Sequence, residues 1–294
     1  MANTPLSPGL TKFLAQFVAA ISGTLFAISD GMTYGWTAPF IPYLISNSSH
    51  IDTDHDEAQW LESSLLFGSF CGLPATIILV DFIGRKKSLL LASFTVLIAW
   101  IAIALGDSMI YIFIARFFKG MAGNMAFVAA PMYIAEIADQ KIRGFLSSII
   151  YIMMLLGCLI VYCVGPYLPY YTPSVIGVSV AVLELAIFSF VPESPLFLVT
   201  KGKVEDARKS LQHFKPYADV DKELKMITDE LERQKEQKGK LTDLVTVSSN
   251  RRAILIMTVL NAGQHLCAYS VILMNLHLIW RLLVPSTWIL LLQP

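Results

Sequence analysis

Four ionisable side chains lie inside long apolar segments: the acids Asp30 and Glu184 and the bases Arg116 and Lys119. A charge inside a membrane costs at least roughly 2.5 kcal/mol, so such a side chain normally faces protein or water. Either acid could carry a proton in a symporter, pair with one of the two bases, or accept a hydrogen bond. Lys119 follows Arg116 by one helical turn on the same face, and for these bases ion pairing within a bundle is the alternative to a functional role.

A second set of charges lies at the ends of the apolar segments. The connection Asp81-Phe82-Ile83-Gly84-Arg85-Lys86-Lys87 is short, and its glycine permits a tight turn. Its order suits an ion-pair latch, with the acid near a helix end and the arginine reaching a neighbouring helix. A solvated charged surface is the alternative, and composition does not separate the two. The residues that we assign to one gate-side salt-bridge network are Asp81, Arg85, Arg116, Glu136, Arg143 and Glu193.

The sequence carries no enzyme signature. It has no phosphate-binding glycine loop, no nucleophile elbow and no histidine pair at metal-ligand spacing, so we expect neither an enzyme nor a bound metal or cofactor. The formal net charge is zero, with 22 basic and 22 acidic residues, which gives no indication of nucleic-acid binding. The four cysteines lie in apolar runs and fit small buried side chains better than a disulfide framework.

Composition indicates the elements that must position these charges. Of the 294 residues 55% are hydrophobic and 15% are charged, whereas a soluble domain carries about a quarter charged residues. A membrane-spanning helix needs about 20 mostly apolar residues. In the second of the candidate spans, Gly68 and Gly72 form a small-xxx-small packing face. The seven candidate spans are 13–45, 63–80, 88–106, 108–135, 144–168, 174–191 and 253–279.

Basic residues alternate between the connections. Lys12, the loop 81–87, the loop 138–143 and the long segment after the sixth span carry lysine and arginine, and the intervening loops carry none. Because basic residues collect on the cytoplasmic side, we expect a cytoplasmic N-terminus in the cell membrane. The sequon at Asn47 then lies in the longest outer loop, where a glycan can be attached.

The segment 192–252 differs from the rest in its soluble composition and its helical periodicity, and we predict cytoplasmic linker helices there. The expected fold is an all-α multi-pass membrane protein. Its predicted parts are a cytoplasmic N-terminus at 1–12, a six-span bundle at 13–191, the linker at 192–252, a seventh span at 253–279 and a tail at 280–294.

Several strings together resemble the sugar porter family of the major facilitator superfamily, and Gly31 to Pro39 is similar to the first span of its insect trehalose-transporter-like members. The strings are Asp81-Phe82-Ile83-Gly84-Arg85-Lys86, Arg116-Phe117 with Gly120 and Gly123, Pro131-x-Tyr133-x-x-Glu136-Ile137, Arg143-Gly144 and Pro192-Glu193-Ser194-Pro195. The resemblance covers roughly residues 10 to 279, and it implies the first six-helix half of a twelve-span fold, a helical linker and one further span.

The resemblance also implies where a sugar would bind. The family's seventh span carries a Gln-Gln-Leu-Ser-Gly string, which is matched here by Gln264-His265-Leu266-Cys267-Ala268. Tyr151 occupies the position of a substrate glutamine in the fifth span of glucose transporters. The candidate sugar ligands are Gln264, His265, Tyr151, Asn124 and Trp36.

The function that follows is facilitative transport of trehalose or a hexose by alternating access, with a small sugar and the bilayer as partners. Because the resemblance ends near Ile279, we expect a truncated half-carrier whose residues 280–294 are foreign to the family. The alternative is a non-transporting isoform that associates with a full-length carrier or a second copy. A seven-span receptor is disfavoured, since it requires an external N-terminus.

Overall fold

The computed structural model describes residues 8–46, 49–51, 53–216, 219–236, 246–276 and 279. The chain divides into two compact units, residues 1–224 and residues 225–294, each of which is described by itself. Asn47 and residues 280–294 lie outside the described residues, so the glycosylation site and the tail stay predictions.

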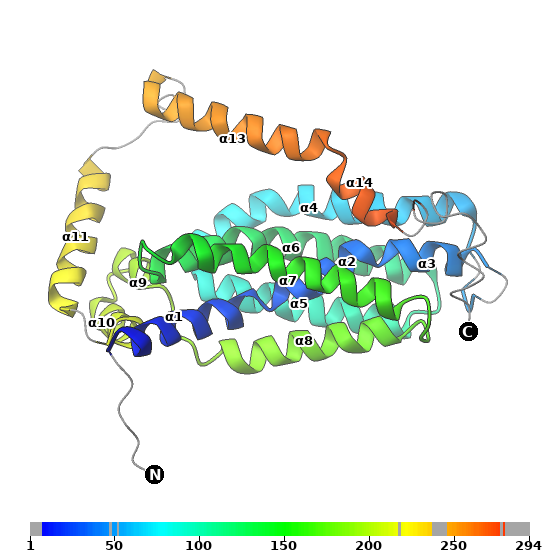
Figure 1. The fold of residues 1–294 in the computed structure, drawn as a ribbon, viewed down its shortest axis with the longest axis horizontal. Helices are drawn as coiled ribbons and strands as arrows, with labels where there is room; N and C mark the ends of the chain where they lie inside the picture. Colours follow the sequence, from blue (N-terminus) through cyan, green and yellow to red (C-terminus); the bar gives the residue numbers. More distant parts are fainter. Residues whose placement is uncertain are drawn as a thin grey trace, which may run out of the picture. The chain divides into compact units, whose positions relative to one another are not determined.

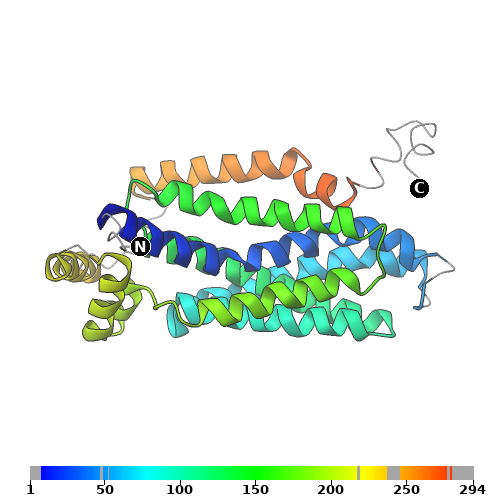
Figure 2. The same cartoon turned by 60° about the horizontal axis from the view of Figure 1, so that its bottom comes forward.

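The first unit is a bundle of helices that run side by side (Figures 1 and 2). Its closest packed pairs are α4 with α6, α5 with α6, α2 with α7, and α5 with α8. The bundle helices are α1 (Pro8–Thr24), α2 (Phe26–Gly35), α3 (Thr37–Leu44), α4 (His55–Ile83), α5 (Arg85–Leu105), α6 (Met109–Ile137), α7 (Arg143–Val164) and α8 (Thr172–Phe188).

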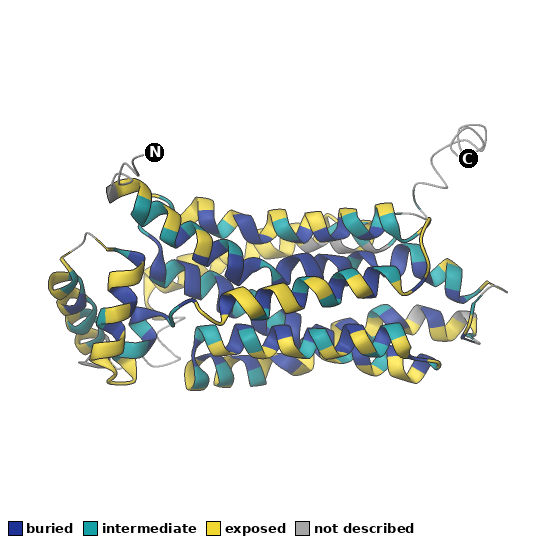
Figure 3. Cartoon of the chain, turned by 90° about the horizontal axis from the view of Figure 1, so that it is seen from below, coloured by how far each residue is buried: buried dark blue, intermediate teal, exposed yellow. Residues whose placement is uncertain are grey.

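Five helical stretches of the described chain are long and apolar enough to cross a membrane, and α8 is a shorter apolar helix of 17 residues. The large apolar side chains on the outer sides of the bundle are exposed, for example Phe70, Phe82 and Leu105 (Figure 3). Such a surface suits lipid and not water. The predicted fold class, an all-α multi-pass membrane protein, is confirmed.

The first predicted span differs from the structure. The sequence indicated one apolar span over 13–45, whereas the candidate span is Gly9–Gly35 and α3 is a separate short helix. Pro39 explains the end of α2, because a proline ring clashes with the carbonyl four residues earlier, which here belongs to Gly35. The helix is therefore interrupted at Trp36, although the backbone of Trp36 itself keeps helical angles, with φ of −61° and ψ of −38°.

Glycines set how closely the bundle helices approach one another. A Cβ atom added at Gly120 of α6 would meet the carbonyl oxygen of Leu65 and would lie 2.8 Å from the backbone nitrogen of Ser69, both on α4. One turn apart on α4, Gly68 and Gly72 face the backbone of α6 in the same way. The packing face predicted from their spacing is thus present, and it brings the α4 and α6 backbones into contact.

The predicted linker begins as helices α9 (Pro195–Thr200), α10 (Val204–Phe214) and α11 (Val220–Glu236). Gln16 of α1 ties α10 to the bundle, since its side-chain nitrogen donates to the carbonyl of Phe214 at 3.2 Å and its oxygen accepts from the backbone nitrogen of Asp139 at 3.1 Å. Lys12 and Lys215 both pair with the Asp139 carboxylate, at 2.6 and 3.7 Å. The first linker helices are therefore docked on one end of the bundle.

The second unit contains helices α13 (Ser248–Leu266) and α14 (Tyr269–Met274). The sequence indicated one continuous span over 253–279, but the helix is interrupted between these two. Ala268 adopts a left-handed backbone conformation at the break, with φ of 54°. A residue with a Cβ atom resists this conformation by roughly 1–2 kcal/mol, so the interruption is a defined feature of this segment.

Candidate functional site

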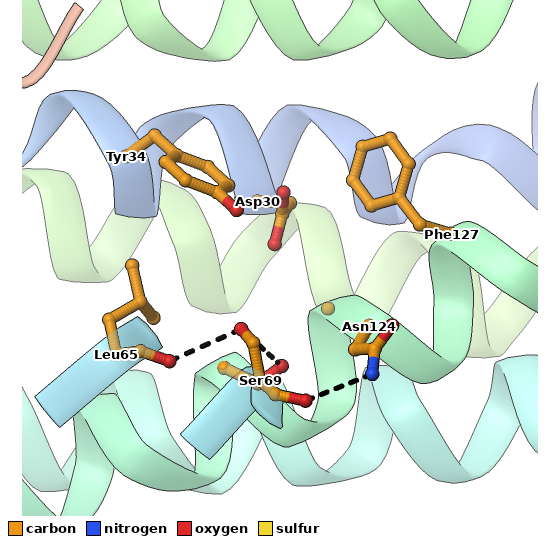
Figure 4. Close-up of a pocket in the computed structure, with 8 residues that line it drawn as sticks. Asp30, Tyr34, Leu65, Ser69, Asn124 and Phe127 are labelled. Atoms are coloured by element: carbon orange, nitrogen blue, oxygen red, sulfur yellow. Dashed lines mark hydrogen bonds between the residues drawn. The ribbon is translucent and has the colours of Figure 1, made fainter. Parts of the chain in front are cut away.

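A cavity of about 150 Å³ lies among α2, α4 and α6, near the middle of the bundle helices (Figure 4). Each helix contributes residues spaced by three or four positions, the spacing that places side chains on one helical face. The lining residues are Asp30, Tyr34, Leu65, Ser69, Gly120, Gly123, Asn124 and Phe127.

The polar groups of this cavity are ordered by hydrogen bonds to helix backbones. The hydroxyl of Ser69 donates to the carbonyls of Leu65 and Gly120, at 3.2 and 3.1 Å. The side-chain nitrogen of Asn124 donates to the carbonyl of Ser69 at 3.0 Å, as Figure 4 shows. The other two polar residues of the wall are Tyr34 and Asp30. Asp30 is only 8% exposed, and its Oδ2 atom has no hydrogen-bond partner among the described residues.

The two bases of α6 are fully buried and occupy different aromatic surroundings. The Lys119 ammonium lies 2.8 Å from the centroid of the Trp100 ring. Arg116 donates from Nε to the carbonyl of Leu61 at 2.9 Å, and its guanidinium lies 5.5 Å from the Trp36 ring centroid. Cations over aromatic faces are favourably placed when they are desolvated.

Trp36 does not line the cavity, contrary to the expectation for a sugar ligand. It is 0% exposed and stacks on Phe40 at 5.0 Å, in an aromatic cluster that also contains Tyr170. Tyr151 is 54% exposed and does not line the cavity either, although its ring lies 6.4 Å from Phe127, which does. Of the candidate ligands in the first unit, only Asn124 is in the cavity wall.

Three other candidates lie elsewhere. Glu184 is buried on α8, outside the cavity, and neither of its carboxylate oxygens has a hydrogen-bond partner among the described residues. Gln264 and His265 belong to the last turn of α13 in the second unit, directly before the helix break, and the side chain of His265 lies outside the described residues. A helix break near mid-membrane is a common setting for transporter substrates.

At the end of the bundle where α4 ends and α5 begins, four charged residues and one serine form what we call the basic-end clasp: Asp81, Arg85, Glu136, Glu193 and Ser194. Arg85 is its centre. Its Nη2 and Nε atoms lie 3.0 and 3.1 Å from Oε1 of Glu136, and its Nη1 atom lies 3.6 Å from Oδ1 of Asp81.

The clasp extends to the linker through Glu193. Its Oε1 atom accepts from the backbone nitrogens of Lys86 and Ser194, at 2.9 and 3.0 Å, while the Ser194 hydroxyl donates to Glu136. Gly84, with φ of +103°, forms the turn over which Glu193 lies. The clasp thus connects the α4–α5 turn, the end of α6 and the start of α9.

Two residues assigned to this network are not part of it. Arg143 is exposed and makes no ion pair with the described residues. Arg116 precedes Glu136 by 20 positions on the same helix, which at 1.5 Å per residue places it about 30 Å away.

Sequence reasoning missed Tyr34, Ser69 and Phe127 as cavity residues. Tyr34 follows Asp30, and Phe127 follows Asn124, by one turn on the same helix. A search of the residues one helical turn after each candidate would have identified both Tyr34 and Phe127. Ser69 is next to Gly68, which belongs to the packing face of α4. This position in the sequence could have identified Ser69 as a candidate.

A family model described as "Sugar (and other) transporter" matches residues 15–279. The chain belongs to the sugar transporter family. The resemblance inferred from the motifs is confirmed. Members of this family are transporters and not enzymes, in agreement with the absence of an enzyme signature in the sequence.

Curated relatives include mouse solute carrier family 2, facilitated glucose transporter member 6, which is 29% identical over 77% of this chain and 46% of its own length. Facilitated trehalose transporter Tret1 of Apis mellifera ligustica is 27% identical, over 74% of this chain and 43% of its own. The galactose-proton symporter of Escherichia coli K12 is 28% identical, over 89% and 55%. The chain spans about half the length of the curated relatives it matches.

Among solved structures, the major facilitator superfamily proton:xylose symporter XylE bound to 6-bromo-6-deoxy-D-glucose has a TM-score of 0.66 and 22% identity, covering 79% of this chain and 56% of that chain. The inward open conformation of XylE from E. coli has a TM-score of 0.67 and 22% identity, covering 91% and 64%. These similarities establish that this member of the sugar transporter family has a major facilitator fold.

Proposed function

We propose that this chain forms one half of a facilitative carrier that moves trehalose or a hexose across a membrane by alternating access. The observation that carries the proposal is the cavity among α2, α4 and α6, in which Asp30, Ser69 and Asn124 converge inside a bundle whose core is mainly apolar. A polar cavity in a membrane bundle suits an uncharged polar solute. The names of the relatives, which include glucose, galactose and trehalose transporters, support the same substrate class.

The small volume of the cavity supports the view that it forms only part of a sugar site. At about 150 Å³ it is half of the roughly 300 Å³ at which small-molecule pockets begin. We therefore propose that it is one wall of the sugar site, with Asn124 as a hydrogen-bonding residue. Tyr151 would act near Phe127. In the second unit, Gln264 and His265 at the helix break after α13 stay candidate sugar ligands. Trp36 would act indirectly, by holding Arg116.

Alternating access requires a closure that can open, and we propose the basic-end clasp for this role. The clasp joins the α4–α5 turn, the end of α6 and the linker helix α9 through charges that can separate into water. We propose that this end is cytoplasmic and that the carrier resides in the cell membrane, because the loops at this end hold the basic residues. A glycan on Asn47 supports this orientation, and an N-terminal tag that antibody reaches on intact cells contradicts it.

The chain spans about half the length of its relatives. We therefore propose that residues matching the other half are needed for transport. We expect vesicles that contain only these 294 residues to show no saturable uptake of labelled trehalose or glucose. Saturable uptake contradicts the half-carrier, and uptake that a proton gradient drives would point to Asp30 or Glu184 as the coupling acid. Co-purification with a full-length carrier would instead favour the non-transporting, associating isoform.

A further inference from the structure

The wall of the cavity among α2, α4 and α6 contains two aromatic residues, Tyr34 and Phe127, as well as the polar groups of Asp30, Ser69 and Asn124. In Figure 4 the two rings lie on either side of Asp30, while Ser69 and Asn124 lie on the other side of the cavity. A solute in this cavity therefore meets aromatic carbon and hydrogen-bonding groups together, and the wall suits a molecule that is itself apolar on one surface and polar on another.

The hydrogen bonds of the wall determine which polar atoms a solute can meet. The Ser69 hydroxyl donates to two backbone carbonyls, and the Oδ2 atom of Asp30 is covered by protein. Asn124 donates from its side-chain nitrogen to the carbonyl of Ser69 at 3.0 Å. Because only the nitrogen of an amide can donate, this bond fixes the orientation of the amide and leaves the Asn124 oxygen as an acceptor for a solute.

The ring of Phe127 lies beside this amide and is held by two other helices. Phe127 follows Asn124 by three positions on α6, which places their Cβ atoms about 5–6 Å apart on one helical face. The ring makes a T-shaped contact with Phe26 of α2 at 5.5 Å and lies 6.4 Å from the ring of Tyr151 on α7. Phe127 is half-buried and has no polar side-chain atom, so it can offer a solute only its ring.

A pyranose ring matches an aromatic ring next to an amide oxygen. In glucose, and in each unit of trehalose, most ring hydroxyls are equatorial, so the two faces of the sugar ring present mainly C–H groups. An aromatic face is the negative part of its quadrupole, and C–H groups next to oxygen are polarised positively, so the two surfaces attract each other. The hydroxyls at the edge of the sugar ring can donate to the amide. An open-chain polyol such as sorbitol has the hydroxyls but no flat C–H face.

We propose that Phe127 makes this site selective for a pyranose, because the C–H face of the sugar ring lies on Phe127 while a ring hydroxyl donates to the amide oxygen of Asn124. Tyr151 is a positioning residue, which supports the Phe127 ring with its own ring and does not need its hydroxyl. This inference rests on the proposed function, since it names the group that selects the substrate class in the same site.

The test is equilibrium binding of labelled glucose to the purified full chain in nanodiscs, with sorbitol as the competitor. We expect the native chain to bind glucose about tenfold more tightly than sorbitol, and Phe127→Leu to lose this preference through about tenfold weaker glucose binding. Phe127→Tyr keeps an aromatic ring and should keep the preference. Phe118→Leu, at an exposed phenylalanine of the same helix that does not line the cavity, is the matched control and should change neither affinity.

A second set of variants tests the positioning role of Tyr151. Tyr151→Phe keeps the ring and should bind both ligands as the native chain does, whereas Tyr151→Leu removes the support of Phe127 and should reduce the preference for glucose about threefold. Because Tyr151 acts through Phe127, adding Tyr151→Leu to Phe127→Leu should cause no further loss. The unfolding temperature of each variant is measured as well, since a general packing defect weakens the binding of glucose and sorbitol alike and leaves their ratio unchanged.

The outcomes separate this inference from the function on which it rests. Absence of saturable glucose binding by the native chain would count against the proposed function itself. Native glucose binding together with an unchanged ratio of glucose to sorbitol affinity in Phe127→Leu overturns the role of Phe127 alone. Loss of the preference in Tyr34→Leu but not in Phe127→Leu would place the sugar on the other aromatic residue of the wall, which also overturns it. Additive losses in the Phe127→Leu/Tyr151→Leu variant would make Tyr151 a sugar ligand and not a positioning residue.

Discussion

Replacing Arg85 with methionine is expected to destabilise the folded chain by about 3–5 kcal/mol, because it leaves Glu136 buried without its countercharge. The side chains of Arg85 and Glu136 are only 12% and 9% exposed, and two arginine nitrogens contact the same carboxylate oxygen. The arginine also lies 5.4 Å from the ring centroid of Phe197 on the linker side. The loss is measured as a lower unfolding temperature of the purified chain and as faster proteolysis at α9.

The matched control is Arg143→Met, at an exposed arginine near the same end of the bundle that has no ion pair among the described residues. Its effect should stay within about 0.5 kcal/mol. Arg85→Met/Glu136→Gln should recover part of the loss, since both charges of the pair are then removed. Equal effects of the Arg85 and Arg143 variants would show that the clasp is an ordinary charged surface.

Gly120→Leu is expected to prevent the close crossing of α4 and α6. A Cβ atom at this position would meet the backbone of Leu65 and Ser69, which cannot turn aside as a flexible side chain can. Overpacking of a core typically costs 1–3 kcal/mol, and a clash with backbone belongs at or above the upper limit. We expect the free energy of unfolding to fall by at least about 3 kcal/mol. The change is measured as a lower unfolding temperature and a lower yield of monodisperse protein.

Gly144→Leu is the comparison for this variant. Gly144 lies near the start of α7, and a Cβ atom there meets nothing within 4 Å. The substitution should therefore be neutral or slightly favourable, since leucine is a better helix former than glycine. If Gly120→Leu and Gly144→Leu both unfold at the same temperature as the unsubstituted chain, α4 and α6 do not cross as closely as described above.

The sequence was most informative where the pattern is local. The length of the apolar runs predicted most of the bundle helices, and the spacing of Gly68 and Gly72 predicted a packing face. The order Asp81, Gly84, Arg85 predicted a latch that reaches another helix, and the structure has Arg85 on Glu136. In each case the physical cause lies within a few residues.

The cavity could be predicted only in part, because it depends on how three helices are rotated against one another. Asn124 and Asp30 were candidates because of their chemistry, whereas Ser69 and Tyr34 become cavity residues through the rotation of α4 and α2. Trp36, directly after the end of α2, lies in an aromatic cluster instead of the cavity wall. Arg116 could have been excluded from the clasp by helix geometry alone.

The central claim is that the cavity among α2, α4 and α6 is a wall of the sugar site, and protection of an introduced cysteine tests it most directly. Asn124→Cys is prepared in a chain whose four native cysteines are replaced by serine, with Tyr167→Cys, at an exposed loop position, as the control. The rate of modification by a small water-soluble thiol reagent is measured with and without trehalose or glucose. The account predicts that sugar slows modification at position 124 and leaves position 167 unchanged. Equal rates at position 124 with and without either sugar would contradict it.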